Sequence, residues 1–132
     1  MTTADNKQLI VNFFERFSAN DIAGGLAMLA DDATWWIAGK PDAPGVHGLL
    51  TKLQLTELFD GMFSLFEAGM RMTVRNMIAE ADKVAVEVES HGPLKDGRVY
   101  QNEYHLAVTI REGKIAAVRE YFDTLYVATL FH

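Results

Sequence analysis

The sequence predicts an α+β fold in which three helices are followed by an antiparallel meander. Apolar residues recur every three or four positions in most of the first half, which is typical of amphipathic helices. From residue 70 onward they alternate with polar residues, which is typical of strands with one buried face. Turns such as Lys95–Arg98 separate these extended runs, and no parallel βαβ unit is indicated.

Three helices are expected before residue 67. Asp5 is a candidate N-cap for the first of them. Its apolar stripe consists of Leu9, Ile10, Phe13, Phe14 and Phe17. A second, short helix is expected over residues 22–29, ending before two aspartates. The third opens at Thr51 and Gln54, which have the spacing of a capping box, and runs to about Phe66 with a broad apolar face.

The extended segments follow from alternation and turn residues. Residues 33–38 are predicted to form the first strand, in which Trp35 and Trp36 must face opposite sides of the sheet. Further strands are expected over residues 70–79, 83–90, 100–111 and 115–123. In the third of these the side chains on the face away from the core include Gln101, Glu103, His105 and Ala107. Thr124 is a candidate cap for a final helical turn.

Length and composition indicate a single domain over residues 1–132. The formal net charge of −6 provides no basic stripe, which argues against a nucleic-acid partner. Cysteine is absent, so disulfides and thiolate metal ligands are excluded, and the four histidines lack metal-ligand spacing. No apolar run approaches membrane length, and no leader pattern opens the chain, so a cytoplasmic location is expected without a membrane partner.

Several short sequence motifs, spread across about residues 9–128, resemble those of a known protein family. They are Asn20-Asp21, Asp32-Ala33-Thr34-Trp35, His47-Gly48, Asp96-Gly97-Arg98, Gly113-Lys114-Ile115 and, most specifically, Arg119-Glu120-Tyr121-Phe122-Asp123-Thr124. With the order of elements, they make the chain similar to the nuclear transport factor 2-like superfamily, and within it to the SnoaL-like, ketosteroid isomerase-related group. The resemblance implies a cone-shaped barrel with three N-terminal helices in the concave face of a strongly bent, mostly antiparallel sheet.

The resemblance also implies a deep apolar cavity, but the family includes isomerases, epoxide hydrolases, dehydratases, polyketide cyclases and simple binding proteins, so the fold does not name a reaction. The positions that carry ketosteroid isomerase chemistry correspond to Ile37, Phe13 and Leu106, which are all apolar. The middle-strand pair of limonene epoxide hydrolase falls on Val88 and Ser90, and a slip of one residue gives Glu89 without an arginine. Only the last-strand carboxylate is kept, as Asp123, which corresponds to the proposed general acid/base of the aldol-type cyclases.

Asp123 is therefore the predicted catalytic residue. A carboxyl group at an apolar cavity wall is poorly hydrated, which favours proton exchange near neutrality. Tyr121 and Arg119 share its face if the strand is regular, and Arg119 would hold the carboxylate ionised. The alternative is structural: Asp123 caps the C-terminal segment while Arg119 pairs with a surface carboxylate.

The predicted pocket lies between the helix over residues 55–66 and the sheet, with a volume of roughly 300 Å³ or more. Its expected wall comprises Tyr121, Tyr104, Trp35 or Trp36, Met62, Phe63 and Arg119. The expected ligand is an apolar cyclic small molecule, and the expected enzyme is a polyketide cyclase-like isomerase that needs no cofactor or metal. An epoxide hydrolase-like enzyme and a non-catalytic binding module remain the alternatives. A homodimer through the convex face of the sheet is also expected.

Overall fold

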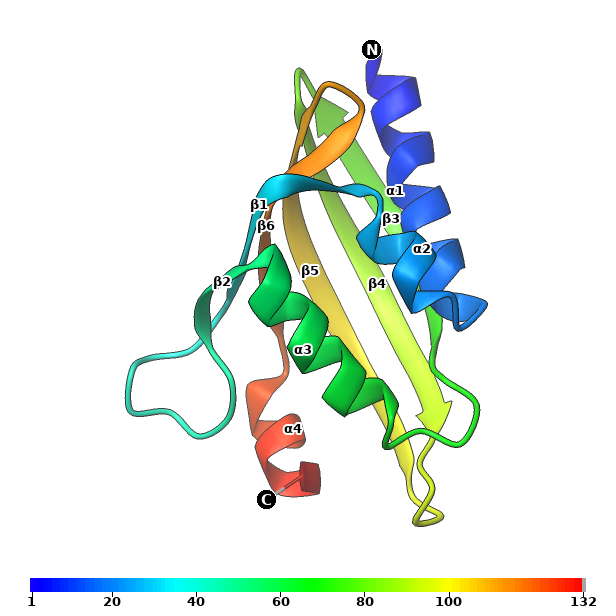
Figure 1. Cartoon of the computed structure of the whole chain (residues 1–132), viewed down its shortest axis with the longest axis vertical. Helices are drawn as coiled ribbons and strands as arrows, with labels where there is room; N and C mark the ends of the chain where they lie inside the picture. The colour runs from blue at the N-terminus through cyan, green and yellow to red at the C-terminus, as the bar shows by residue number, and fades with distance from the viewer. Residues whose placement is uncertain (132) are drawn as a thin grey trace.

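The computed structural model describes residues 1–131 and confirms the α+β fold (Figure 1). The elements in chain order are α1 (Thr3–Ser18), α2 (Ile22–Leu26), β1 (Leu29–Ile37), β2 (Gly48–Thr51), α3 (Lys52–Phe63), β3 (Arg71–Glu80), β4 (Lys83–Pro93), β5 (Val99–Arg111), β6 (Lys114–Phe122) and α4 (Thr124–Phe131). His132, one of the histidines assigned no metal role above, lies outside the described residues.

The six strands form one curved, unclosed sheet in the order β2-β1-β6-β5-β4-β3. The β1–β6 pair is parallel, and every other neighbouring pair is antiparallel. Helices α1 and α3 lie across the same face of this sheet, which is its concave face (Figure 1). The cone-shaped, mostly antiparallel arrangement expected from the resemblance is therefore confirmed.

Two reciprocal capping boxes fix the starts of the long helices. The box of α3 joins Thr51 and Gln54 as predicted, with backbone N–H groups donating to Oε1 at 2.9 Å and to Oγ1 at 3.2 Å. In α1 the cap is Thr2, and Asp5 is its partner three residues later. The prediction that Asp5 caps α1 was wrong because the helix begins three residues earlier than its apolar stripe suggests.

Several elements differ from the sequence prediction, including β4, which runs to Pro93 rather than to residue 90. Helix α2 ends at Leu26, because Gly24 and Gly25 are poor helix formers, and residues 29–32 already belong to β1. Strand β2 was not predicted, since its four residues are too few to show alternation; it pairs with β1 through contacts such as Trp36 opposite Leu49. Helix α3 ends at Phe63 rather than near Phe66.

The main core fills the space between the helices and the concave face, and its most buried side chains include Ile10, Leu55, Val84, Val86, Val88, Leu106 and Ile115. A second cluster lies at the end of the sheet where α4 packs, which we call the α4 end. It consists of Phe66, Met70, Leu94 and Tyr100, with Tyr126, Val127, Leu130 and Phe131 of α4 against it. Within residues 1–131 no helix combines the length and apolarity needed to cross a membrane.

Candidate functional site

The concave face carries one carboxylate, Glu120, among apolar neighbours. On β6 the residues Val118, Glu120 and Phe122 point inward, opposite inward residues of β5. Glu120 lies beside Leu106 of β5 and Ile37 of β1, which are both buried. The indole Nε1 of Trp35 donates a hydrogen bond of 3.1 Å to Glu120 Oε1.

This environment changes the acidity of Glu120. Burial raises the pKa of its carboxyl to about 7, and the hydrogen bond from Trp35 opposes that rise. Glu120 as a whole keeps a partly accessible surface, whereas its carboxyl group is buried beside the indole of Trp35. Because its pKa lies near neutrality, Glu120 is suited to both accepting and returning a proton.

A chain of three hydroxyl groups lies on β4 and β5. Ser90 Oγ is 3.0 Å from Tyr104 Oη, and Tyr104 Oη is 2.6 Å from Tyr100 Oη. Asn102 Nδ2 donates to Tyr100 Oη at 3.0 Å. The three hydroxyls carry three protons, and the two bonds between them use two. Within residues 1–131 no further acceptor takes the third proton, so the chain retains one donor for a ligand.

The hydroxyl chain and Glu120 share the concave face. Tyr104 lies opposite Phe122 and Leu106 lies opposite Glu120, so Tyr104 and Glu120 are diagonal neighbours about 7–8 Å apart between their backbones. Burial is the main cause that raises the pKa values of Tyr100 and Tyr104, and the charge of Glu120 adds to it. Both phenols therefore stay protonated at neutral pH, which keeps the one unused proton of the chain in place.

Aromatic side chains form the wall around these polar groups. Trp35 contacts Phe59 edge-on at 5.8 Å between ring centroids, and Phe59 contacts Phe63 in the same way at 5.9 Å. Of the predicted pocket residues, Trp35 and Tyr104 face the concave side, and Met62 and Phe63 pack against its core clusters from α3. Tyr104, Met62 and Phe63 are only half-buried, so solvent reaches this part of the face.

The structure places three other predicted wall residues on the outer, convex face. The guanidinium of Arg119 lies 3.9 Å from the centre of the Trp36 ring and donates to Tyr121 Oη at 3.2 Å. Tyr121 contacts Trp36 edge-on at 5.3 Å and is 42% exposed. Because odd-numbered residues of β6 from Arg119 onward point outward, these side chains lie on the opposite side of the sheet from Glu120.

Asp123 lies between β6 and α4 and is exposed. Its Oδ1 accepts a hydrogen bond of 3.0 Å from the backbone N–H of Tyr126, which is the capping arrangement considered above. Asp123 also lines a hollow of about 300 Å³ with Glu89, Gln101, Asn102, Glu103 and Tyr126. Neither this hollow nor the other one, described below, lies between α3 and the sheet. A catalytic role for Asp123 stays a prediction.

Metal ligation finds no support in the part of the chain that the structure describes. Among residues 1–131 no three His, Cys, Asp or Glu side chains come together in a way that could hold a metal ion. The groups that the concave face brings together are one carboxylate, two phenols, one serine hydroxyl and one amide. Such a set can exchange a proton and stabilise a developing negative charge on oxygen.

Residues 10–118 match the family model of the SnoaL-like domain. The chain belongs to the SnoaL-like family. This family lies within the nuclear transport factor 2-like superfamily, as the resemblance indicated. No functionally curated protein matches the sequence.

Solved structures similar to this SnoaL-like chain include TerC co-crystallised with polyporic acid, at 24% identity over 96% of this chain and 97% of that one, with a TM-score of 0.79. A nuclear transport factor 2-like protein of Burkholderia xenovorans LB400 is 26% identical over 100% and 99% of the two chains, with a TM-score of 0.74. IdmH of Streptomyces antibioticus, provisionally described as a polyketide cyclase, is 20% identical over 95% and 97%, with a TM-score of 0.77. The likeness to TerC and IdmH shows the shared fold.

Proposed function

We propose that this SnoaL-like protein binds an apolar cyclic small molecule against the concave face and moves a proton on it through Glu120. The observation that carries the proposal is a buried carboxyl group held by Trp35 at 3.1 Å, and burial raises the pKa of that carboxyl to about 7. A group that titrates near the working pH is the most effective general acid/base, because both of its protonation states are populated. Glu120 takes here the role that sequence analysis gave to Asp123.

The proposed chemistry is an isomerisation or an aldol-type ring closure. Ionised Glu120 removes a proton from a carbon next to a carbonyl, and the hydroxyl chain at Tyr104 donates a hydrogen bond to the carbonyl oxygen as it becomes an enolate. In isomerisation, Glu120 returns the proton to another carbon of the same system. In ring closure, the enolate carbon attacks a second carbonyl, and the new alkoxide takes the proton. Neither route requires another reactant.

The named relatives support the substrate class. TerC was co-crystallised with polyporic acid, and IdmH is provisionally described as a polyketide cyclase. The half-buried aromatic side chains between α3 and the sheet, such as Phe59, Phe63 and Phe122, provide apolar contacts suited to flat cyclic molecules. Polyporic acid is therefore the first ligand to test, followed by polycyclic ketones with an acidic α-carbon.

The decisive experiment compares Glu120→Gln with Asp123→Asn. Both variants replace a carboxylate by an amide of the same shape. We expect Glu120→Gln to slow deuterium exchange at the α-carbon of a bound polycyclic ketone by about 10²–10⁴-fold, the usual contribution of a general acid/base. Asp123→Asn keeps a capping oxygen and should leave exchange nearly unchanged.

The opposite ranking of the two variants would return the catalytic role to Asp123 and refute the assignment to Glu120. Tyr104→Phe tests the hydrogen-bond donor on its own, because it keeps the ring but removes one hydroxyl of the chain. We expect the rate of deuterium exchange to fall by about 10²-fold or more. Ligand binding without any exchange in the wild-type protein would instead identify a non-catalytic binding module.

We also propose a homodimer formed through the convex face, in a protein of the cytoplasm. Gln101, Glu103, His105 and Ala107 are exposed there, beside the cluster of Trp36, Arg119 and Tyr121. Aromatic residues and arginine are enriched in protein interfaces, which supports this choice of face. Sedimentation at micromolar concentration tests the proposal, and a monomer that persists there would remove the dimer.

A further inference from the structure

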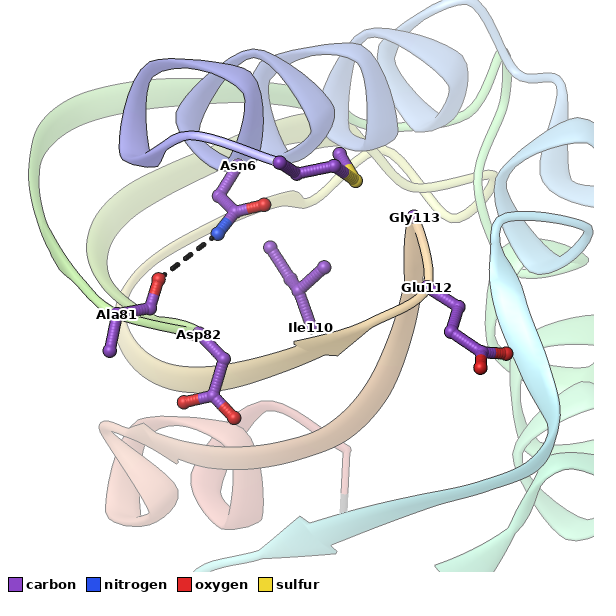
Figure 2. Close-up of a pocket in the computed structure, with 7 residues that line it drawn as sticks. Asn6, Ala81, Asp82, Ile110, Glu112 and Gly113 are labelled. Atoms are coloured by element: carbon purple, nitrogen blue, oxygen red, sulfur yellow. Dashed lines mark hydrogen bonds between the residues drawn. The ribbon is translucent and has the colours of Figure 1, made fainter.

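A second hollow lies far from Glu120, at the end of the sheet that carries the β3–β4 and β5–β6 turns, which we call the turn end (Figure 2). It has a volume of about 580 Å³, within the range of small-ligand sites. Its lining comes from three separate segments and consists of Met1, Asn6, Ala81, Asp82, Ile110, Glu112 and Gly113. The seven residues of β6 from Lys114 to Glu120 span roughly 20 Å, so the two sites lie far apart.

Hydrogen bonds hold the segments around this hollow together. The backbone N–H of Ile110 donates to the carbonyl oxygen of Asp82 at 2.8 Å, which joins the two turns. Asn6 Nδ2 donates to the carbonyl oxygen of Ala81 at 3.3 Å, which ties α1 to the β3–β4 turn (Figure 2). The hollow therefore exists before any ligand arrives.

Asn6 provides an acceptor that the protein does not use. Asn6 is 3% exposed. The hydrogen bond from Nδ2 to the carbonyl oxygen of Ala81 fixes which end of the side-chain amide carries the oxygen. Figure 2 shows the oxygen turned away from Ala81, above the Ile110 side chain. Oδ1 has no hydrogen-bond partner among residues 1–131. A buried acceptor without a donor is costly, so a ligand that donates a hydrogen bond here is favoured.

The charges around the hollow specify the ligand further. The lining side chains that carry charge are the carboxylates of Asp82 and Glu112. The lysines next to the two turns are engaged elsewhere: Lys83 Nζ donates to Thr109 Oγ1 at 2.7 Å, and Lys114 Nζ donates to the carbonyl oxygen of Ala27 at 2.8 Å. Even with the α-amino group of Met1 counted against the carboxylates, the lining is net negative.

We propose that the turn end binds a small organic cation with a primary ammonium and an apolar body. The ammonium donates a hydrogen bond to Asn6 Oδ1, and Ile110, which lies beside that oxygen in Figure 2, contacts the apolar body. The exposed carboxylates of Asp82 and Glu112, which Figure 2 shows directed away from Asn6, attract the charge over a longer distance. A bare metal ion fits less well, since residues 1–131 bring no three metal-ligating side chains together. This site is separate from the concave face and does not depend on the function proposed for Glu120.

The test uses three molecules of nearly the same shape and different charge: benzylammonium, neutral benzyl alcohol and anionic benzoate. In ¹⁵N-edited NMR spectra of the full chain, we expect benzylammonium to give saturable shifts at the amides of Ala81, Asp82 and Gly113. The alcohol and the benzoate should give weaker shifts or none. Equal shifts from the alcohol, or no saturable shift with benzylammonium at millimolar concentration, would overturn the proposal.

Variants separate a specific site from a general effect of the acidic protein. Asp82→Asn and Glu112→Gln should each weaken benzylammonium binding by about two- to five-fold, in keeping with partly exposed charge pairs. Glu57→Gln removes the same charge from the exposed side of α3 and should leave the affinity unchanged. Asn6→Leu should weaken binding by at least about ten-fold; if that variant fails to fold, the two carboxylate variants still decide. Unchanged affinity in the Asp82→Asn/Glu112→Gln double variant would refute the site.

Discussion

Replacing Glu120 by Gln should make the protein more stable at pH 8 and leave its stability unchanged near pH 4.5. The amide keeps an acceptor oxygen for the indole of Trp35 but does not ionise. In the wild-type protein, burial holds the pKa of Glu120 at about 7, compared with an ordinary value of 4.5. Between these two pH values the folded protein keeps a proton that the unfolded chain has released. Rising pH therefore lowers the stability of the wild-type protein across this window.

The size of the effect follows from the two pKa values. Each pH unit between them is worth about 1.4 kcal/mol, so the window gives about 3.5 kcal/mol at most. Solvent that reaches the half-buried residue reduces this to about 2–3 kcal/mol. With a urea dependence of about 1–3 kcal/mol per molar, the unfolding midpoint of Glu120→Gln should exceed that of the wild-type protein by roughly 1–3 M at pH 8.

The assay is equilibrium urea unfolding of both proteins at half-unit steps from pH 4.5 to 8. Glu103→Gln, on the exposed outer face of β5, is the control for a change of one charge, and its curves should follow those of the wild-type protein. A stability difference between Glu120→Gln and wild type that stays constant over this range would refute the reasoning. Glu120 would then not titrate near neutrality, and the proposed proton transfer would lose its basis.

Three further outcomes are expected. Trp35→Phe removes the donor that lowers the pKa of Glu120, so the pH transition described above should move upward, which a carboxyl-resolved NMR titration would detect. Leu55→Ala, at a side chain 1% exposed, should cost about 2–5 kcal/mol in urea unfolding. Asp123→Ala removes the cap on Tyr126 and should cost about 1 kcal/mol, visible as faster amide hydrogen exchange within α4, whereas Asp123→Asn should keep most of the protection.

The period of the apolar pattern was enough to predict the helices and most strands. Capping chemistry located the start of α3 at Thr51, because Thr and Gln at that spacing satisfy each other's backbone groups. Short elements escaped prediction for a physical reason. Four residues of β2 carry too little alternation, and their strand forms because β1 offers an unpaired edge. Such tertiary pairing is not visible in a local window of sequence.

The candidate site was harder to predict because strand parity decides which side chains meet. From the sequence, Tyr121 and Asp123 were predicted to face the cavity, because the family resemblance pointed to that aspartate. The apolar residues Val118 and Phe122 share the parity of Glu120, and they mark the concave face. A lone carboxylate within an apolar set was therefore the signal for Glu120. The hydroxyl chain from Ser90 to Tyr100 had no such signal, because it joins side chains of two strands.

Glu120 also lowers the stability of the folded protein at neutral pH, which favours a functional rather than a structural role. A carboxylate beside Leu106 and Ile37 loses hydration, and Trp35 is its one donor among the described residues. A leucine or glutamine there would serve packing better. The carboxyl nevertheless lies on the same face as Tyr104, whose hydroxyl chain keeps a proton to donate. An acid/base group and a hydrogen-bond donor that both titrate away from their usual ranges, on diagonal positions of one wall, are what enolate chemistry requires.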